Sequence, residues 1–179
     1  VASGKGAINA LFKRDDALST HDKPPRHLAA LLLKGPKLLG DRPWSGVPFR
    51  PLRFNFVAGV GEFFSLPFYT HTAGECRSFL FEAVPGGPMD RFGAARDGAE
   101  VLDVAKGVIM DFAPDDLHHM DGAELTDPNA WLVGAFTPTI RHPVGALPSG
   151  QIVMALGDTA VLNDPITGQG SNNASRMVQ

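Results

Sequence analysis

The chain has 179 residues, of which 20% are charged, and a formal net charge of −3 at pH 7. This slightly acidic balance argues against a nucleic-acid or anionic-membrane partner. The hydrophobic fraction of 44% is that of an ordinary globular protein, and the length allows one sizeable core and a second, smaller lobe.

The number of cysteines indicates the redox conditions of the protein's compartment. Cys76 is the single cysteine, so it cannot form an internal disulfide, which fits a reducing compartment and predicts a cytoplasmic location. We interpret Cys76 as a structural thiol and not as a reactive one. The longest apolar run, residues 28–33, is far too short to span a bilayer.

The amino-terminal residues 1–6, Val-Ala-Ser-Gly-Lys-Gly, indicate the end of a strand entering a glycine-rich turn. Because the chain starts at Val1 without methionine, we expect it to be part of a longer protein. A GxGxxG phosphate-binding pattern would need glycine at position 9, where Asn9 stands, so a loop is favoured over a phosphate site.

Strand patterns dominate the first half of the chain. Residues 26–34 are strongly apolar and are typical of a buried strand or a short helix, and residues 35–51 are rich in Gly and Pro and predict a long loop. Alternating, aromatic-rich segments at 52–56, 62–69 and 75–84 predict three strands with short links. Such strands imply an antiparallel sheet with at least one covered face.

Residues 97–113 carry the clearest helix pattern. Apolar residues three or four positions apart form one stripe: Val101, Ala105, Val108 and Phe112. Asp97 is a suitable N-cap, and Glu100 three residues later completes a capping box. Pro114 ends the pattern. We expect this helix to cover the sheet.

Strand patterns return after the helix. Residues 131–140 predict a strand that continues through 141–144, and residues 151–156 predict a further strand. The order of strands, one helix and strands indicates an α+β fold, with an antiparallel or mixed sheet covered by one main helix. His118 and His119 are neighbours in sequence and cannot both face one ion from a regular element, so no metal site is predicted.

The most informative stretch lies near the carboxyl end. Gly157 and Asp158 follow the last predicted strand, and a Pro/Gly loop then leads into a helix. A carboxylate at a strand end can accept hydrogen bonds from sugar-like hydroxyls, and a helix amino end favours negative charge. Gly168 and Gly170 let the backbone approach a planar ring. The stretch predicts a site for an anionic, hydroxyl-bearing ligand; the alternative is a turn followed by a helix that Ser171 caps.

A family resemblance rests on residues 163–174, Asn-Asp-Pro-Ile-Thr-Gly-Gln-Gly-Ser-Asn-Asn-Ala, and on the preceding Gly-Asp pair. They resemble the second flavin-binding motif of the para-hydroxybenzoate hydroxylase-like flavoprotein monooxygenases. The string is most similar to the oxygenase component of styrene and indole monooxygenases. Residues 1–6, 84–90 and 136–141 agree with that subfamily, so the resemblance spans nearly the whole chain.

The resemblance implies a domain organisation. The chain would hold the substrate-side domain of the para-hydroxybenzoate hydroxylase-like fold and a strand–loop–helix FAD motif. Residues 1–6 would end a strand of the FAD-binding domain, 7–150 would form the substrate-binding domain, and 151–179 would return to the FAD-binding domain. The family's amino-terminal βαβ unit, which holds the adenosine diphosphate half of FAD, is expected to lie outside this chain. We therefore expect weak or no FAD binding by this segment.

The resemblance also assigns site residues. Asp158 would bond the ribityl chain of FAD, and Pro165 and Ile166 would form a wall at the flavin face. The implied cofactor-binding set is Gly157, Asp158, Pro165, Gly168, Gln169, Gly170, Ser171, Asn172 and Asn173. The implied substrate pocket is Ile166 with residues of the aromatic strands: Phe79, Phe81, Phe64, Leu66 and Phe68. Which strand face looks at the flavin is left open, and each aromatic residue could instead belong to the core.

The implied activity is the epoxidation of styrene-like or indole-like alkenes through a flavin C4a-hydroperoxide, with the hard chemistry carried by the flavin. The enzyme would be a two-component, FAD-dependent monooxygenase, and a separate NADH-dependent flavin reductase would supply reduced FAD. No side chain is predicted to be a catalytic acid or base, and this segment alone is expected to be inactive. The alternatives are a non-catalytic segment that binds an apolar ligand and a one-component aromatic hydroxylase. The substrate would be small, apolar and aromatic, and a homodimer is left open.

Overall fold

The computed structural model describes residues 7–36, 38, 53–165 and 168–179. The strand end predicted at 1–6, most of the loop predicted at 35–51, and Ile166 lie outside these residues.

The chain divides into two compact units. We call residues 26–135 the sheet unit, and residues 1–25 with 136–179 the terminal unit. The domain boundary expected at residue 150 concerns the organisation of a longer enzyme and stays a prediction.

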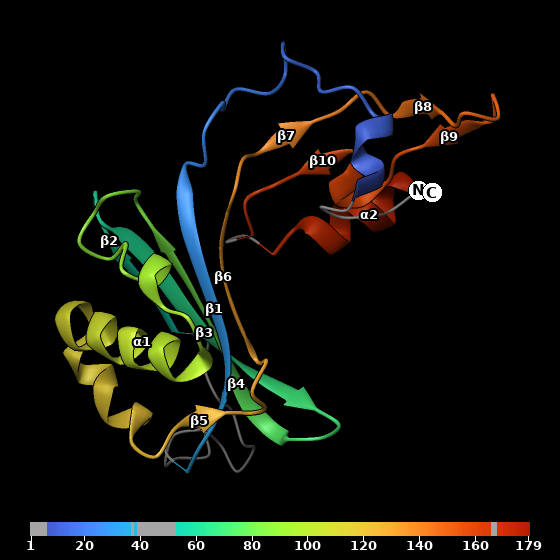
Figure 1. Cartoon of the computed structure of the whole chain (residues 1–179). Helices are drawn as coiled ribbons and strands as arrows, with labels where there is room; N and C mark the ends of the chain where they lie inside the picture. Colours follow the sequence, from blue (N-terminus) through green and yellow to red (C-terminus); the bar gives the residue numbers. More distant parts are fainter. Residues whose placement is uncertain (1–6, 37, 39–52, 166–167) are drawn as a thin grey trace. The chain divides into compact units, whose positions relative to one another are not determined.

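The sheet unit is built on one six-stranded sheet (Figure 1). The strand order is β2-β3-β4-β1-β5, and β6 also pairs with β1. The pairs β1–β4, β1–β5, β2–β3 and β3–β4 are all antiparallel. The strands are β1 (Arg26–Lys34), β2 (Arg53–Val57), β3 (Gly61–Thr70), β4 (Gly74–Ala83), β5 (Glu124–Leu125) and β6 (Trp131–Phe136).

Side-chain alternation decides which face of the sheet is buried. Ala29 pairs with Phe81, and Phe81 pairs with Phe63, so these residues form one row on one face of β1, β4 and β3. All three are buried, and the rings of Phe63 and Phe81 stack with centroids 5.2 Å apart. The strands predicted for this half of the chain are confirmed, and residues 26–34 form a strand and not a helix.

The helix α1 (Gly98–Phe112) covers this buried face (Figure 1). The Asp97 carboxylate accepts the Glu100 N–H at 2.9 Å, and the Glu100 carboxylate accepts the Arg96 N–H at 2.7 Å. The predicted helix and its Asp97 N-cap are confirmed, whereas the Glu100 carboxylate bonds the N–H of Arg96, one residue before the N-cap at which the glutamate of a capping box would bond. Val101 and Val108 are fully buried in the same cluster as the sheet residues, so the α+β class with a helix-covered antiparallel sheet is also confirmed.

The remaining elements are short. In the sheet unit they are the 3₁₀ helices η2 (Phe92–Ala94) and η3 (Pro114–Met120). In the terminal unit they are η1 (Ala7–Leu11), β7 (Thr139–Ile140), β8 (Val144–Ala146), β9 (Ile152–Met154), η4 (Gly157–Thr159), β10 (Val161–Leu162) and α2 (Gly170–Met177).

The long strand predicted at 131–140, with its continuation through 141–144, is wrong. β6 ends at Phe136, and Pro138, which has no N–H to donate, stands between β6 and β7. β7 pairs with β10 and not with the main sheet, and Pro143 precedes β8, which pairs with β9. Two prolines within six residues therefore divide one apolar pattern into three strands.

In the terminal unit, the strand predicted at 151–156 is reduced to the three residues of β9. A small core of Phe12, Ala155 and Ala160 lies beside it. In both units, no helix of the described residues is long and apolar enough to cross a membrane.

Candidate functional site

The turn η4 carries the Gly157-Asp158 pair that the sequence singled out. Gly157 is buried and has φ of 58°, a backbone conformation that favours glycine. A Cβ at this position would lie 3.2 Å from the Cβ of Ala174 in α2. Glycine therefore provides both the turn and the close packing of α2 against it.

Arg141 stabilises this turn through hydrogen bonds to its backbone. Its Nη1 donates to the carbonyl oxygen of Asp158 at 3.3 Å and to that of Thr159 at 3.2 Å. Thr159 is fully buried, whereas Asp158 is half-buried. The guanidinium thus uses the backbone carbonyls of the turn and does not occupy the Asp158 carboxylate in these contacts.

The Asp158 carboxylate lies beside the first residue of α2. A Cβ added to Gly170 would stand 3.4 Å from Asp158 Oδ1, so the missing side chain leaves the carboxylate next to the helix amino end. The first backbone bond of α2 runs from Asn173 N–H to Gln169 C=O at 2.9 Å. The N–H groups of Gly170, Ser171 and Asn172 precede that bond, as in the first turn of any helix.

The loop before α2 folds locally. Gly168 has φ of 62°, and its N–H donates to the Pro165 carbonyl at 2.9 Å. The Asn172 side-chain amide donates to Gln169 Oε1 at 3.0 Å. Gln169 is the N-cap residue and makes no side-chain capping bond. The alternative with Ser171 as the helix cap is therefore wrong, since Ser171 lies inside the helix.

The predicted cofactor residues occupy one continuous turn–loop–helix segment. It brings Gly157, Asp158 and Gly170 together, and Gln169 beside Asn172. Pro165, Gly168, Gln169, Ser171 and Asn172 are exposed, and Asn173 is half-buried. An acceptor carboxylate, the backbone amides at the start of a helix and two glycines form a donor and acceptor set that fits a ribityl chain and the edge of a flavin ring. Binding of FAD by these residues stays a prediction.

The predicted pocket residues of the sheet lie on two opposite faces. Phe79 and Phe81 are buried under α1 in the main core, which favours the alternative that they are core residues. Phe64, Leu66 and Phe68 alternate with the buried residues of β3 and lie on the other face. The structure therefore does not bring the five residues into one pocket.

One apolar groove is lined mainly by residues of the sheet face away from α1, with Trp131 at its edge. Its volume is about 300 Å³, and its lining includes Ala30, Leu32, Phe68, Ser78, Trp131 and Leu132. Leu66 pairs with Ser78, and Ser78 pairs with Leu32, so Leu66 lies in the same cross-strand row as two lining residues. Phe64 pairs with Leu80, the partner of the lining residue Ala30, so the sheet register places Phe64, Leu66 and Phe68 on the face of this groove.

Sequence reasoning missed a histidine–carboxylate pair. His27 Nδ1, at the start of β1, lies 2.9 Å from Asp90 Oδ1, and the Gly86 N–H donates to Asp90 Oδ2 at 2.7 Å. Partial burial alone would raise the pKa of Asp90, but the Gly86 N–H and the His27 ring together lower it below its ordinary value. Asp90 ends the stretch 84–90, whose tight Pro/Gly turn was the available signal.

Among the described residues, no three His, Cys, Asp or Glu side chains cluster as metal ligands would. The described features that could contact a ligand are the Asp158 carboxylate beside the start of α2 in the terminal unit and the apolar groove of the sheet unit.

Comparison with known families identifies the domain. Residues 4–118 match the family described as "Styrene monooxygenase A putative substrate binding domain". This match covers more than half of the chain, and the chain belongs to that family.

Relatives agree with the family match. The chain is 27% identical over 181 residues to proteins named styrene monooxygenase StyA from Pseudomonas fluorescens and from a Pseudomonas species. Each alignment covers 98% of this chain and 41% of the relative. The chain therefore spans about two fifths of the length of these relatives.

Proposed function

We propose that the chain is part of the oxygenase component of a two-component, FAD-dependent monooxygenase that epoxidises small apolar aromatic alkenes. The observation that carries the proposal is the half-buried Asp158 carboxylate beside Gly170 at the amino end of α2. That arrangement occurs in a chain that belongs to a styrene monooxygenase substrate-binding domain family.

In this proposal, Asp158 accepts hydrogen bonds from ribityl hydroxyls, and the amides at the start of α2 stabilise negative charge at the pyrimidine edge of the flavin. A helix amino end contributes roughly 0.3–1 kcal/mol to such a charge at an exposed position. Gly168 and Gly170 keep side chains away from the ring. When bound, FAD supplies the oxygen-transfer chemistry, and no side chain is required as an acid or base.

The sheet unit contributes substrate binding in this proposal. The groove beside Phe68 and Leu32 is lined mainly by apolar side chains, with the Ser78 hydroxyl as one polar group. It suits an aromatic hydrocarbon, which binds by surface burial and shape. Residues 7–150 would act as the substrate-binding domain, residues 151–179 as the second flavin motif, and residues 1–6 as a strand end of the FAD-binding domain.

A separate NADH-dependent flavin reductase would supply the reduced FAD, in the cytoplasm. A second candidate function is non-catalytic binding of an apolar ligand, and the groove favours it because all of its lining belongs to the sheet unit.

The test supplies the full-length oxygenase component, of which this chain would be a part, with reduced FAD, oxygen and styrene, and measures styrene oxide by chromatography. We expect epoxide without any NADH in the assay. Asp158→Asn removes the anionic acceptor, so it should weaken binding of reduced FAD by roughly tenfold, the effect of losing a hydrogen bond to a charged group. Asp103→Asn changes the same charge on the exposed side of α1 and should change neither readout.

The outcomes separate the candidates. Styrene binding without epoxide would favour the non-catalytic function, and turnover that requires NADH but no reductase would indicate a one-component hydroxylase. Equal FAD affinity in the Asp158→Asn variant and the parent would contradict the role of Asp158 even if epoxide forms.

A further inference from the structure

A second cavity, of about 260 Å³, lies in the sheet unit near the start of β1. Its apolar wall includes Ala83, Phe92 and Val133, and its polar groups include the side chains of His27 and Asp90. An apolar cavity of about 150 Å³ holds one benzene ring. A volume of 260 Å³ is therefore enough for two fused rings.

This cavity and the groove share no lining residue, and most of their side chains come from opposite faces of the sheet. His27 pairs with Ala83, and Ala83 belongs to the buried cluster that α1 covers. Phe92, from η2, packs in the same cluster, and its ring lies 5.1 Å from that of Phe81. Phe68 and Leu32 of the groove alternate with these buried residues and face the other way. The cavity is therefore not an extension of the groove.

The polar side chains of the cavity offer hydrogen-bond acceptors. An ionised carboxylate only accepts, so His27 must donate its Nδ1–H to Asp90 across the 2.9 Å contact. In the neutral imidazole, this leaves Nε2 as an acceptor. The Asp90 oxygens have about four lone-pair sites, and the His27 ring and the Gly86 N–H leave capacity for a further donor.

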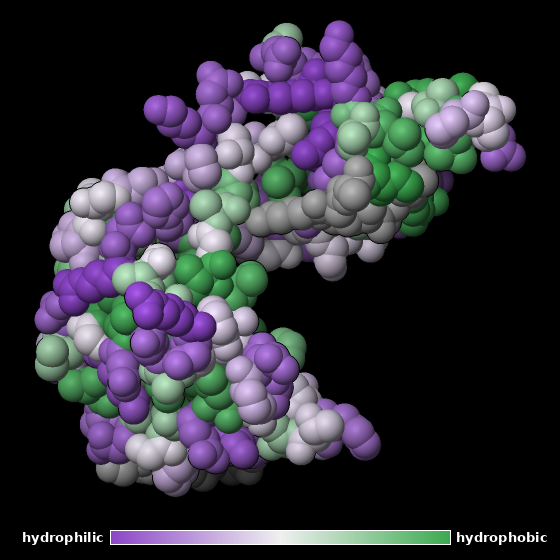
Figure 2. Space-filling model, in the orientation of Figure 1, coloured by the Kyte–Doolittle hydropathy of each residue, from purple (hydrophilic) through white to green (hydrophobic). Residues whose placement is uncertain are grey.

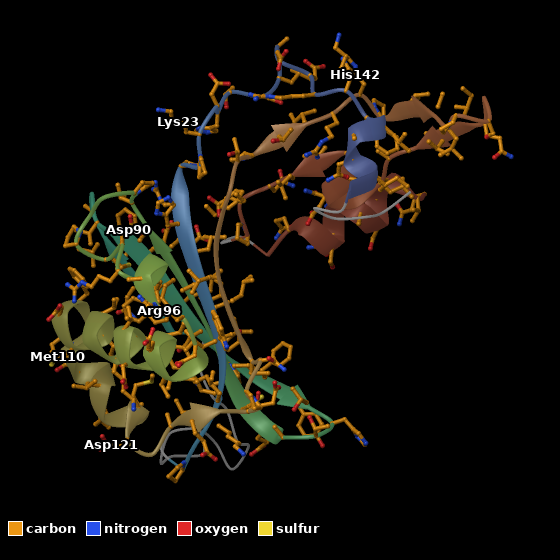
Figure 3. The ribbon with its side chains drawn as sticks, viewed as in Figure 1. Lys23, Asp90, Arg96, Met110, Asp121 and His142 are labelled. Atoms are coloured by element: carbon orange, nitrogen blue, oxygen red, sulfur yellow. The ribbon has the colours of Figure 1, made fainter. Side chains whose placement is uncertain are left out.

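The exposure of the pair places it where a ligand can reach it. The His27 side chain is 45% exposed, whereas that of Asp90 is 15% exposed. Asp90 lies on the segment that follows β4 (Figure 3). Its carboxylate is fixed by two contacts, one with His27 of β1 and one with the N–H of Gly86 in its own loop. A fixed, partly desolvated acceptor beside an apolar wall selects for a ligand with a matching donor, because an unmatched polar group would lose its hydration without compensation.

We propose that this cavity is a second ligand site, which binds a one- or two-ring aromatic molecule carrying an O–H or N–H donor that bonds to the His27–Asp90 pair. The site is separate from the groove to which the proposed function assigns the substrate, and it does not depend on flavin binding.

The test compares two probes of nearly equal shape, 2-naphthol and 2-methylnaphthalene, which differ by a hydroxyl in place of a methyl group. Fluorescence titration of the intact protein should show 2-naphthol binding more tightly by roughly tenfold. In Asp90→Asn, which removes the anionic acceptor, the preference should fall to about twofold or less. Asp103→Asn, the matched change on the exposed side of α1, should keep the preference of the parent.

Two further measurements locate the binding and do not depend on Asp90. The ring ¹H–¹⁵N NMR signals of His27 should shift on addition of 2-naphthol, whereas those of the exposed His71 should not. Gly134→Leu adds apolar bulk to the cavity wall, where an added Cβ meets nothing within 4 Å. It should weaken the binding of both probes and leave the ratio of their affinities unchanged.

Three results would overturn the proposal: equal affinity of the two probes in the parent, an unchanged preference in Asp90→Asn, or saturable binding with an unshifted His27 ring. Absence of binding by either probe up to its solubility limit would overturn it as well.

Discussion

The two units of the chain are stabilised in different ways. In the sheet unit, seventeen buried residues form one apolar cluster beneath α1, whereas the terminal unit has a buried cluster of three, counted over the described residues. The terminal unit is instead rich in specific hydrogen bonds. Ser19 Oγ donates to the Ile140 carbonyl at 3.1 Å and accepts the Ile140 N–H at 3.0 Å, and Arg141 holds the η4 turn.

Both units expose some large apolar side chains. The β8–β9 hairpin of the terminal unit exposes Val144, Ile152 and Met154, and apolar residues are visible over it in Figure 2. A region with few buried apolar contacts opens locally at lower free energy. The comparison indicates that the sheet unit supplies most of the stability, whereas the predicted flavin residues lie in the less stable terminal unit.

The largest expected effect is that of Phe81→Ala in the sheet unit. Phe81 is fully buried, and its ring lies 5.2 Å from that of Phe63 and 5.1 Å from that of Phe92. The cavity left behind should lower the free energy of unfolding by about 3–5 kcal/mol, measured by urea denaturation. Phe56→Ala deletes the same ring at a position that is 63% exposed and should cost less than about 0.5 kcal/mol. Similar losses in the two variants would contradict a stability centred on this cluster.

A smaller effect is expected for Gly145→Ala in the terminal unit. The added Cβ would stand 2.6 Å from the Leu11 carbonyl oxygen and 3.1 Å from the Phe12 ring. Because backbone must move to make room, we expect a loss of about 1–3 kcal/mol, confined to this unit. Amide hydrogen exchange should become faster at Ala155 and stay unchanged at Phe81.

Gly134→Ala is the control for Gly145→Ala, because a Cβ at Gly134 meets nothing within 4 Å. It should leave the exchange rates of both units unchanged. If Gly145→Ala accelerated exchange at Phe81 as much as at Ala155, the two units would be one cooperative unit and the contrast between them would not hold.

The sequence predicted the sheet unit well because its signals are local and repeated. Strand alternation across residues 62–69 and 75–84 and the apolar stripe of α1 are each set by side chains within one element, and Asp97 caps that helix as its spacing requires. In the terminal unit, strands of two or three residues are too short for a periodic pattern, so Pro138 and the pairing of β7 with β10 decided the structure.

The candidate sites were likewise predictable only where their residues are close in the sequence. Asp158 and Gly170 are twelve residues apart in one motif, so the sequence alone pointed to their proximity. His27 and Asp90 are 63 residues apart and meet only because β1 pairs with β4, so no local spacing revealed them. The sequence also could not tell which face of β4 the helix covers, and for that reason Phe79 and Phe81 were grouped with residues of the opposite face.

The loss of folding stability at low pH tests the contribution of the Asp90 contact in the sheet unit. The folded-state pKa of Asp90 is lowered, so its contribution is present above the ordinary carboxylate pKa and is lost as the pH falls through the folded-state value. Between about pH 5 and pH 2, the parent should therefore lose more stability than Asp90→Asn, measured as the urea midpoint at each pH. Asp103→Asn should lose as much stability as the parent over the same pH range. An identical slope in Asp90→Asn and the parent would show that the contact with His27 and Gly86 contributes nothing to folding.

The smallest effect, and the only gain, is expected for Gly107→Ala in α1. Gly107 lies in the helix interior, and an added Cβ meets nothing within 4 Å, so the change removes the helix penalty of glycine and should stabilise the protein by about 0.5–1 kcal/mol. Gly98→Ala, at the first residue of the same helix, should instead destabilise it, because the new Cβ would contact the side chains of Leu125 and Trp131. Hydrogen exchange should show the Gly107→Ala gain across α1 and its sheet, with no change at Ala155. An equal gain in hydrogen-exchange protection at Ala155 would mean that the terminal unit unfolds together with the sheet unit, despite its small core.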